Sequence, residues 1–397
     1  MKRILRPSLA ARLCLAGAVL LAALTGAGAQ GLFWDRPGAL SAAGVRFSSI
    51  AATQQSLVAA WEEIVPSAVR TEGAIYVSLA ARGPQSDWRY RYRVVGPIRY
   101  SGLDPGSEPL VYSMAVDKGR VLLAVATDER EISIYEGDDQ LSFRQLTRLS
   151  TQVSVVTPSL FVTSRGTLLL LVTQSSVAAD ATASTDSVSL LWSRSSDGRS
   201  WSALAPFVAG AEAGAGVQLQ PDHASFHGKE VVVFQSQRSV TEGYQIYAKI
   251  SPDGGETWQP AQAITSLPAF DQTVGGTGYK AANFSNARPR LSPLGDKLAM
   301  GWERNLLGVA SPVIYYCELN DKAEVSHPAE PVSGSAPGIM AQPLRLADRD
   351  YLLYAESVSG SYRIVLSEHR GNAWVPSILG QTLSGSSRSP QGIQLDG

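Results

Sequence analysis

Polar residues that could bind a ligand or move a proton recur at one position of a repeated pattern. Six times a largely apolar run ends in an acid or an amide; residues 168–172 and 231–234 are two such runs. The polar residues are Glu62, Asp128, Gln174, Gln235, Glu303 and Glu356. Carboxylates at such places can act as general acids or bases, or can accept hydrogen bonds from a ligand. The alternative is that these side chains only close strand ends and solvate the loops that follow.

Histidines give little indication of metal binding. The chain has four, and His223 and His227 are only four residues apart. In an extended strand this spacing separates them by roughly 13 Å, too far for one zinc ion. We therefore expect no metal and no cofactor, and a structural or surface role for this pair. Asp222 and His223, at the start of an inner strand, could still line an axial channel.

Strands must position these residues, because the body of the chain has no sustained helical period. A turn sequence, Ser251-Pro-Asp-Gly-Gly-Glu-Thr-Trp258, stands between two of them. Asp253 can accept hydrogen bonds from the backbone N–H groups that follow, Gly255 can adopt a positive φ, and Ser251 can bond the turn from its other side. Thr257 and Trp258 complete the pattern, and the tryptophan leads into the next strand.

The same turn occurs elsewhere in the chain. The defined positions of two further copies, one shortened and one degraded, are Ser195, Asp197, Gly198 and Trp201, and then Ser367, Gly371 and Trp374. In the degraded copy His369 replaces the aspartate. About 58 residues, or twice that, separate the tryptophans, and similar steps towards the N-terminus reach Phe143 and Trp88. A period of this size, with four short apolar runs inside it, is typical of a propeller blade.

The pattern Ser-x-Asp-x-Gly-x-Thr-Trp resembles the Asp box of sialidases and of many other β-propellers. The resemblance and the six polar strand ends together predict an all-β fold: a six-bladed β-propeller of the sialidase type with four antiparallel strands per blade. The resemblance also implies that the boxes lie on one face and that a ligand binds on the opposite face. Such propellers include enzymes and non-enzymes, so the fold alone does not define the activity.

A sialidase would need three arginines for the substrate carboxylate, a tyrosine nucleophile polarised by a glutamate, and an aspartate acid/base. Arg46, Arg288 and Arg388 precede inner strands and are the candidate arginines. Sialidases carry their first arginine in an Arg-Ile-Pro tripeptide, whereas Arg46 lies between Val45 and Phe47. No tyrosine or aspartate matches the catalytic positions. We expect that the three guanidinium groups do not converge, and we assign no catalytic residue.

The N-terminus predicts export. Basic residues precede the apolar run 13–24, and small residues before Gln30 suit cleavage, so residues 1–29 form a signal peptide. The mature protein would then be periplasmic, on the cell surface or extracellular, with no integral membrane segment. Residues 30–43 are a linker or closure segment, and residues 44–397 the propeller. Residues 388–397 resemble the opening strand of a blade: either they close the ring by pairing with the first blade, or the natural chain continues.

Charge and cysteine content limit the possible functions. The net charge is −1 with acids and bases interleaved, which excludes the basic footprint of a nucleic-acid-binding protein. After cleavage only Cys317 remains, so no internal disulfide can form. We predict a non-catalytic binding or scaffolding module for a glycan or protein ligand. The alternative is a sialidase-type glycoside hydrolase. The predicted binding residues are Arg46, Glu62, Asp222, His223, Gln235, Arg288, Glu303, Glu356 and Arg388.

Overall fold

The computed structural model describes most of the chain beyond residue 44. The residues described are 18–20, 45–66, 71–81, 88–99, 111–128, 130–138, 140–151, 154–176, 187–209, 212, 217–238, 243–266, 272–274, 277–279, 285–305, 312–334, 336–359, 361–379 and 391–393. Among these residues there is no helix long and apolar enough to cross a membrane.

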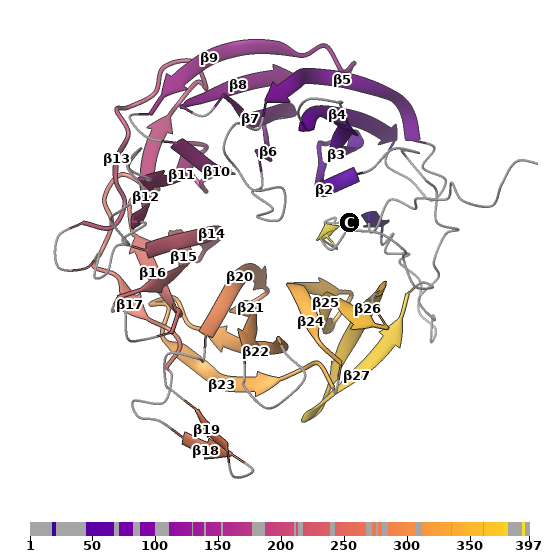
Figure 1. Ribbon diagram of the computed structural model, residues 1–397, viewed down its shortest axis with the longest axis vertical. Helices are drawn as coiled ribbons and strands as arrows, with labels where there is room; N and C mark the ends of the chain where they lie inside the picture. The colour runs from indigo at the N-terminus through magenta and orange to yellow at the C-terminus, as the bar shows by residue number, and fades with distance from the viewer. Residues whose placement is uncertain are drawn as a thin grey trace, which may run out of the picture.

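The described strands form six antiparallel sheets around a central axis, each from four strands consecutive in the chain (Figure 1). This confirms the predicted six-bladed, all-β propeller. The first three blades are β2 (Val45–Ala52), β3 (Ser56–Pro66), β4 (Thr71–Ala81) and β5 (Trp88–Arg99); β6 (Tyr112–Asp117), β7 (Arg120–Asp128), β8 (Glu131–Gly137) and β9 (Arg144–Ser150); and β10 (Ser154–Val162), β11 (Leu168–Ser176), β12 (Ser187–Ser195) and β13 (Ala205–Pro206).

The other three blades repeat this order. They are β14 (Val217–Phe226), β15 (Lys229–Gln237), β16 (Gln245–Ser251) and β17 (Gln262–Ala263); β20 (Ser285–Leu294), β21 (Lys297–Asn305), β22 (Val313–Leu319) and β23 (Val325–Pro331); and β24 (Gly338–Leu346), β25 (Arg349–Val358), β26 (Ser361–Arg370) and β27 (Ala373–Ile378). Blades 3 and 4 also share one parallel bridge, between Val188 and Val217.

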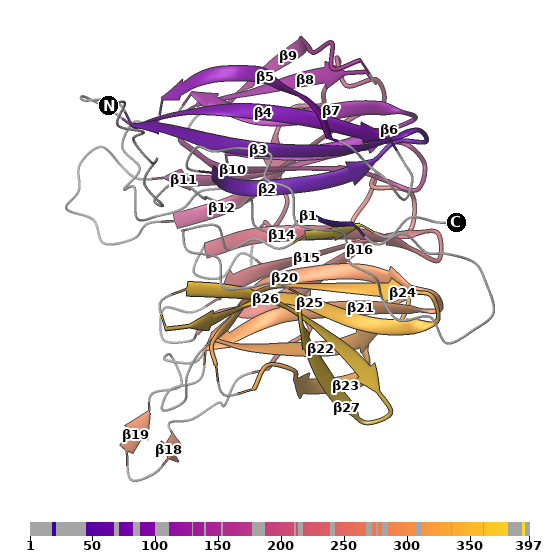
Figure 2. The same ribbon diagram turned by 90° about the vertical axis from the view of Figure 1, so that its right-hand side faces the viewer.

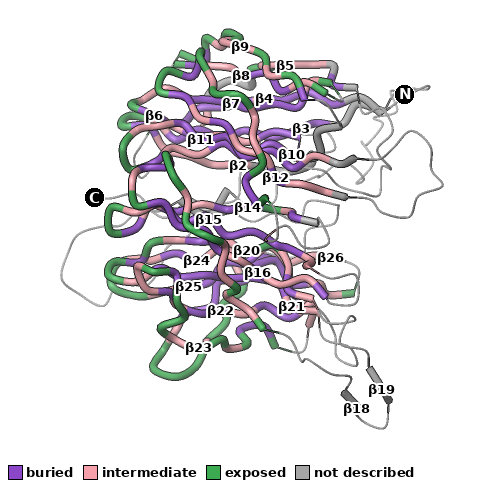
Figure 3. Tube along the Cα trace, turned by 90° about the vertical axis from the view of Figure 1, so that its left-hand side faces the viewer, coloured by how far each residue is buried: buried purple, intermediate pink, exposed green. Residues whose placement is uncertain are grey.

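Burial explains why the second strand of each blade is so apolar. The leucines and Val172 of residues 168–172 are fully buried, as are the valines and Phe234 of residues 231–234, because neighbouring blades cover both faces of these strands. The outermost strands are exposed instead; no residue of β23 is buried (Figure 3). Continuous apolar runs therefore mark second strands, and polar ones mark the rim.

Two short strand pairs lie outside the blades. β18 (Gln272–Val274) and β19 (Thr277–Tyr279) form a hairpin that projects from the ring (Figure 2). β28 (Gln391–Ile393) lies beside β2 and β24, at the place where the ring closes (Figure 1). Pairing with the first blade was one of the two alternatives for this segment; β28 contacts β2 and pairs in parallel with β1 (Ala18–Leu20), inside the segment expected to be the signal peptide.

The turn after β16 has the hydrogen bonds expected from its sequence. Asp253 Oδ1 accepts bonds from the backbone N–H groups of Glu256 at 3.0 Å and Thr257 at 2.9 Å, and Ser251 Oγ accepts one from Gly255 N at 2.8 Å. Gly255 has φ 91°, a conformation that a residue with a Cβ rarely adopts. The turn after β12 repeats this arrangement around Asp197.

The degraded copy has a different local structure. His369 and Trp374 are paired across the tight β26–β27 hairpin, with Gly371 at φ 63° in the turn. Trp374 Nε1 donates a 2.6 Å hydrogen bond to Glu330 of blade 5. Without the aspartate, a short hairpin replaces the wider turn, and the tryptophan still packs into the interface with the preceding blade.

Two substitutions separate the contribution of the turn hydrogen bonds from that of the packed tryptophan. Asp253→Ala should lower the free energy of unfolding by about 1 kcal/mol, because an exposed turn loses its acceptor. Trp258→Ala should lower it by about 3 kcal/mol or more, because the indole packs on Phe207 and Trp192. Urea unfolding measures both, with Asp348→Ala in an exposed hairpin as the control. Equal losses for Asp253→Ala and Trp258→Ala would contradict this assignment.

Candidate ligand-binding site

Four of the six polar strand-end residues lie at equivalent positions beside bulges in the inner strands. Gln235 is paired with Leu219, Glu303 with Ala287, and the register shifts directly after each pair. Glu62 in blade 1 and Gln174 in blade 3 also pair directly before a register shift. In blade 6 this place belongs to Ala355, and Glu356 lies one residue further along the strand. The predicted phase of the repeat is therefore confirmed at four places and is wrong by one residue at Glu356. Asp128 ends β7 beyond the last residue of that strand that pairs with its inner strand.

Three of the bulges contain a residue other than glycine with a positive φ. These residues are Gln220 at 50°, Arg288 at 49° and Met340 at 59°, on the innermost strands of blades 4, 5 and 6. This conformation costs an L-residue of this kind roughly 1–2 kcal/mol. A bulge redirects the side chain that it carries, and bulges are frequent near functional sites. Here they leave the side chains of Gln220 and Arg288 exposed.

Glu303 connects the bulges of blades 5 and 6. Its Oε2 accepts a 2.7 Å hydrogen bond from Arg288 Nη1, and its Oε1 accepts one of 2.8 Å from the backbone N–H of Met340. The side chain is 2% exposed. Burial raises the pKa of Glu303, although Arg288, the Met340 N–H and Arg290 all favour the carboxylate. Both oxygens are therefore occupied, one by Arg288 of the same blade and the other by the backbone of blade 6.

Asp222 has the same role between blades 4 and 5. Its Oδ2 accepts a 2.7 Å hydrogen bond from the backbone N–H of Leu291, and its Oδ1 lies 3.4 Å from Arg290 Nη1. Burial raises the pKa of Asp222, against the opposing effects of Arg290 and of hydrogen bonds from the Leu291 and His223 N–H groups. Two of the acids predicted to bind a ligand, Asp222 and Glu303, thus each accept a backbone hydrogen bond from the next blade.

The arginines of this region keep surface that a ligand can reach. The Arg288 side chain is 43% exposed and the Arg290 side chain 32%. Their acidic partners are almost completely buried. At the bulges of blades 4 and 5, the accessible charge is therefore positive, although the protein as a whole is nearly neutral.

Sequence reasoning missed two further arginines at the same strand ends. The Arg238 guanidinium lies 4.0 Å from the ring centre of Tyr247, and that of Arg304 lies 5.2 Å from the ring centre of Tyr315. The Nε of each arginine is buried without a hydrogen-bond partner, as are Arg238 Nη2 and Gln235 Oε1. Their positions in the sequence could have identified them, because both follow a predicted polar strand end. Arg304 directly follows Glu303, and Arg238 comes three residues after Gln235.

Other predicted residues are committed to local contacts. Glu356 Oε2 accepts a 2.6 Å hydrogen bond from Arg363 Nε on the adjacent strand. Glu62 is fully buried. His223 Nε2 lies 2.8 Å from Glu230 Oε2, beneath the ring of Phe161. His227 lies exposed in the next turn, so the two histidines do not act together.

The predicted arginine cluster can be followed only in part. Arg288 is paired with Glu303 of its own blade. Arg46 is paired with Glu62 in the strand register, but its side chain and all of Arg388 lie outside the described residues. The expectation that the three guanidinium groups do not converge therefore stays a prediction. Within the described ranges, no group of three or more His, Cys, Asp or Glu side chains could hold a metal ion.

Comparison with known proteins identifies the fold. No protein-family model matches the chain, and no curated protein matches it. Among solved structures, a GH93 α-L-arabinofuranosidase of Fusarium graminearum is 14% identical with a TM-score of 0.50, and the match covers 72% of this chain and 83% of that one. A PL25 ulvan lyase is 10% identical with a TM-score of 0.50, covering 71% and 74%. The Trypanosoma rangeli sialidase is 13% identical with a TM-score of 0.46, covering 83% and 55%.

This chain has a six-bladed β-propeller fold similar to the structures of the arabinofuranosidase and the ulvan lyase. At 14% and 10% identity, this likeness shows the fold and no activity. The function must therefore be argued from the residues of this chain.

Glu230 gives the propeller a stability that depends on pH. Burial alone would raise the pKa of Glu230, but hydrogen bonds from His223, Ser164 and Ser225 outweigh it and lower the pKa to about 2. A lowered carboxyl pKa stabilises the fold fully above the ordinary value of 4.5, and this contribution is lost as the pH falls towards 2.

Glu230→Gln should therefore cost about 2 kcal/mol at pH 7, and the deficit should shrink steadily between pH 5 and pH 2. Urea unfolding of both proteins across this range measures it. The exposed substitution Glu324→Gln should show a small difference that hardly changes with pH. A Glu230→Gln deficit that is constant from pH 7 to pH 2 would refute the assignment.

Proposed function

We propose that this protein binds an anionic glycan, without cleaving it, at the bulged ends of blades 4 and 5. One observation carries the proposal: Asp222 and Glu303 are buried and bonded to the next blade, whereas their partners Arg290 and Arg288 are partly exposed. Guanidinium groups suit sugar carboxylates and sulfates, because their paired N–H donors match the geometry of two oxygens.

The stacked arginines support the same ligand class. Arg238 and Arg304 lie on tyrosine rings at the same strand ends. A rigidly held guanidinium loses little conformational entropy when it binds an anion. Two structures with this fold, an α-L-arabinofuranosidase and an ulvan lyase, are by name enzymes of carbohydrates, which favours a glycan over a protein ligand. The N-terminal apolar run further suggests that the glycan is met outside the cytoplasm.

A glycoside hydrolase is the second candidate. Burial raises the pKa of both Asp222 and Glu303, and a raised carboxyl pKa is a property of a general acid. Against it, Glu303 would have to release Met340 N–H and Arg288 before either oxygen could meet a glycosidic bond. Binding without turnover requires no such rearrangement.

Arg288→Ala should weaken the binding of an anionic glycan about tenfold, because one charge-assisted contact is lost. Titration calorimetry with sialyllactose, oligogalacturonate and a sulfated oligosaccharide measures it at two salt concentrations. Arg349→Ala is the matched control, since this arginine is also exposed and also paired with a glutamate, but lies beside the β24–β25 turn, at the end of β24 away from the bulge. Binding to none of the three glycans, or equal weakening by both substitutions, would refute the proposal.

The hydrolase is tested separately. The purified protein is incubated with a fluorogenic sialoside and with a panel of other aryl glycosides. We expect no turnover above the level of a heat-denatured sample. Turnover that disappears in Glu303→Gln, while the fold is retained, would replace the binding function with glycoside hydrolysis.

A further inference from the structure

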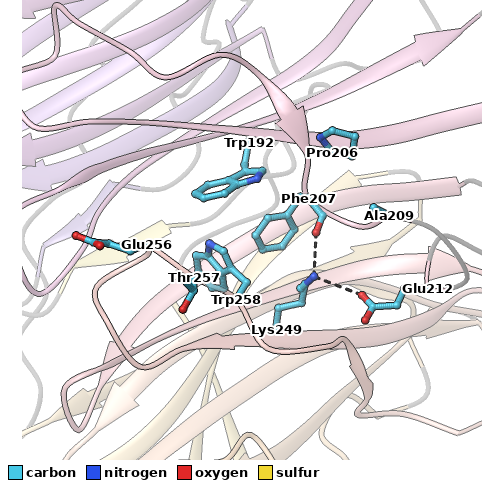
Figure 4. Close-up of a pocket in the computed structure, with 9 residues that line it drawn as sticks. All are labelled: Trp192, Pro206, Phe207, Ala209, Glu212, Lys249, Glu256, Thr257 and Trp258. Carbon is cyan, nitrogen blue, oxygen red and sulfur yellow. Dashed lines mark hydrogen bonds and ion pairs between the residues drawn. The ribbon is translucent and has the colours of Figure 1, made fainter.

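A cavity lies at the rim of the propeller, between blades 3 and 4 (Figure 4). Its volume is about 350 Å³, at the lower end of the range of small-molecule sites. Trp192, Phe207 and Trp258 form its aromatic wall, and Lys249 and Glu212 supply charge. It is separate from the bulges, because Glu256 and Thr257 of the Asp253 turn also line it.

Trp258 in this cavity is held differently from its counterpart in blade 3. Trp201 Nε1 donates a 2.9 Å hydrogen bond to Gly198 O, which ties the indole to its own turn. Trp258 Nε1 has no hydrogen-bond partner. Its ring packs edge-on against Phe207, 5.0 Å between centres, and against Trp192, 6.4 Å between centres. The Trp258 ring is thus positioned by aromatic packing and faces the cavity.

Lys249 and Glu212 place opposite charges beside this wall. Lys249 is 8% exposed, and its Nζ donates a 3.0 Å hydrogen bond to Phe207 O. The same Nζ lies 3.4 Å from Glu212 Oε2 (Figure 4). An ammonium has three N–H donors, so at least one is left for a ligand. Glu212 is part-exposed and can accept further hydrogen bonds.

This combination selects a ligand by its chemistry. A cation would be repelled by Lys249, and an anion by Glu212 and Glu256. A pair of neighbouring hydroxyls fits both charges, because one oxygen accepts from the ammonium and the other hydroxyl donates to the carboxylate. The C–H face of a sugar ring is apolar and packs on aromatic side chains. A neutral sugar has both features.

We infer that the rim cavity binds one neutral sugar residue, with a ring face against Trp192 or Trp258 and two hydroxyls between Lys249 and Glu212. The site does not depend on the glycan site proposed at the bulges. It takes the opposite class of sugar, so the two can be tested independently on one protein.

The probes are the methyl glycosides of mannose, galactose, glucose and arabinose, with methyl glucuronide as the anionic comparison. Saturation-transfer NMR detects binding, and a titration followed by tryptophan fluorescence gives the affinity. We expect saturable binding of at least one neutral glycoside, with the strongest transfer to its ring C–H protons. Binding of no neutral glycoside, or tighter binding of the glucuronide, would overturn the inference.

Variants locate the binding. Glu212→Gln should weaken the neutral glycoside about tenfold, because a charge-assisted hydrogen bond becomes a neutral one. Lys249→Met should do the same while filling a similar volume, and Arg288→Ala should have no effect. If Lys249→Met does not fold, Glu212→Gln alone tests the site. We expect this variant to fold, because Glu212 is part-exposed. Neutral-sugar binding that is unchanged in Glu212→Gln, or that is lost in Arg288→Ala, would refute the rim site.

Discussion

The propeller depends on the attachment of each blade to the next. A blade has apolar side chains on both faces and is stable only when neighbours cover them. Hydrophobic clusters fill the interfaces from blades 1 and 2 through to blades 5 and 6. Each interface also has a directional hydrogen bond from one blade to the next. The bonds are Tyr112 Oη to Ala60 O, Leu160 N to Ser113 Oγ, Ser164 N to Glu230, Leu291 N to Asp222 and Met340 N to Glu303.

Apolar packing alone would allow neighbouring blades to slide, since it has little directional preference. The polar bonds fix the offset, and a buried acceptor left without its donor would cost about 1–3 kcal/mol. The interface between blades 6 and 1 differs among the described residues. The cluster around Leu353 lies within blade 6 and that around Trp61 within blade 1. Strand β28 lies between them. Closure of the ring thus uses a different kind of contact from the five interfaces around it.

The sequence alone predicted what depends on local pattern. The period, the strand order and the turn bonds of Asp253 all follow from residue type and spacing, so they could be predicted before the fold was known. The roles of Asp222 and Glu303 could not, because their backbone partners are 69 and 37 residues away on another blade. The positive φ of Arg288 could not be predicted either, because no glycine marks that position in the sequence. Glu212 in the rim cavity comes from a connecting segment without a periodic pattern.

The double role of Glu303 would couple the proposed ligand binding to the ring. Its carboxylate holds Arg288 and the strained Met340 backbone at the same time. An anion that draws Arg288 away leaves Glu303 buried with less positive charge nearby, and its pKa, already raised by burial, then rises further. Since the ligand-bound state would favour the protonated acid, binding of an anionic glycan would take up a proton. The bond from Met340 N–H survives this change, because a neutral carboxyl still accepts through its carbonyl oxygen. The interface between blades 5 and 6 would therefore persist if Arg288 turned to the proposed ligand.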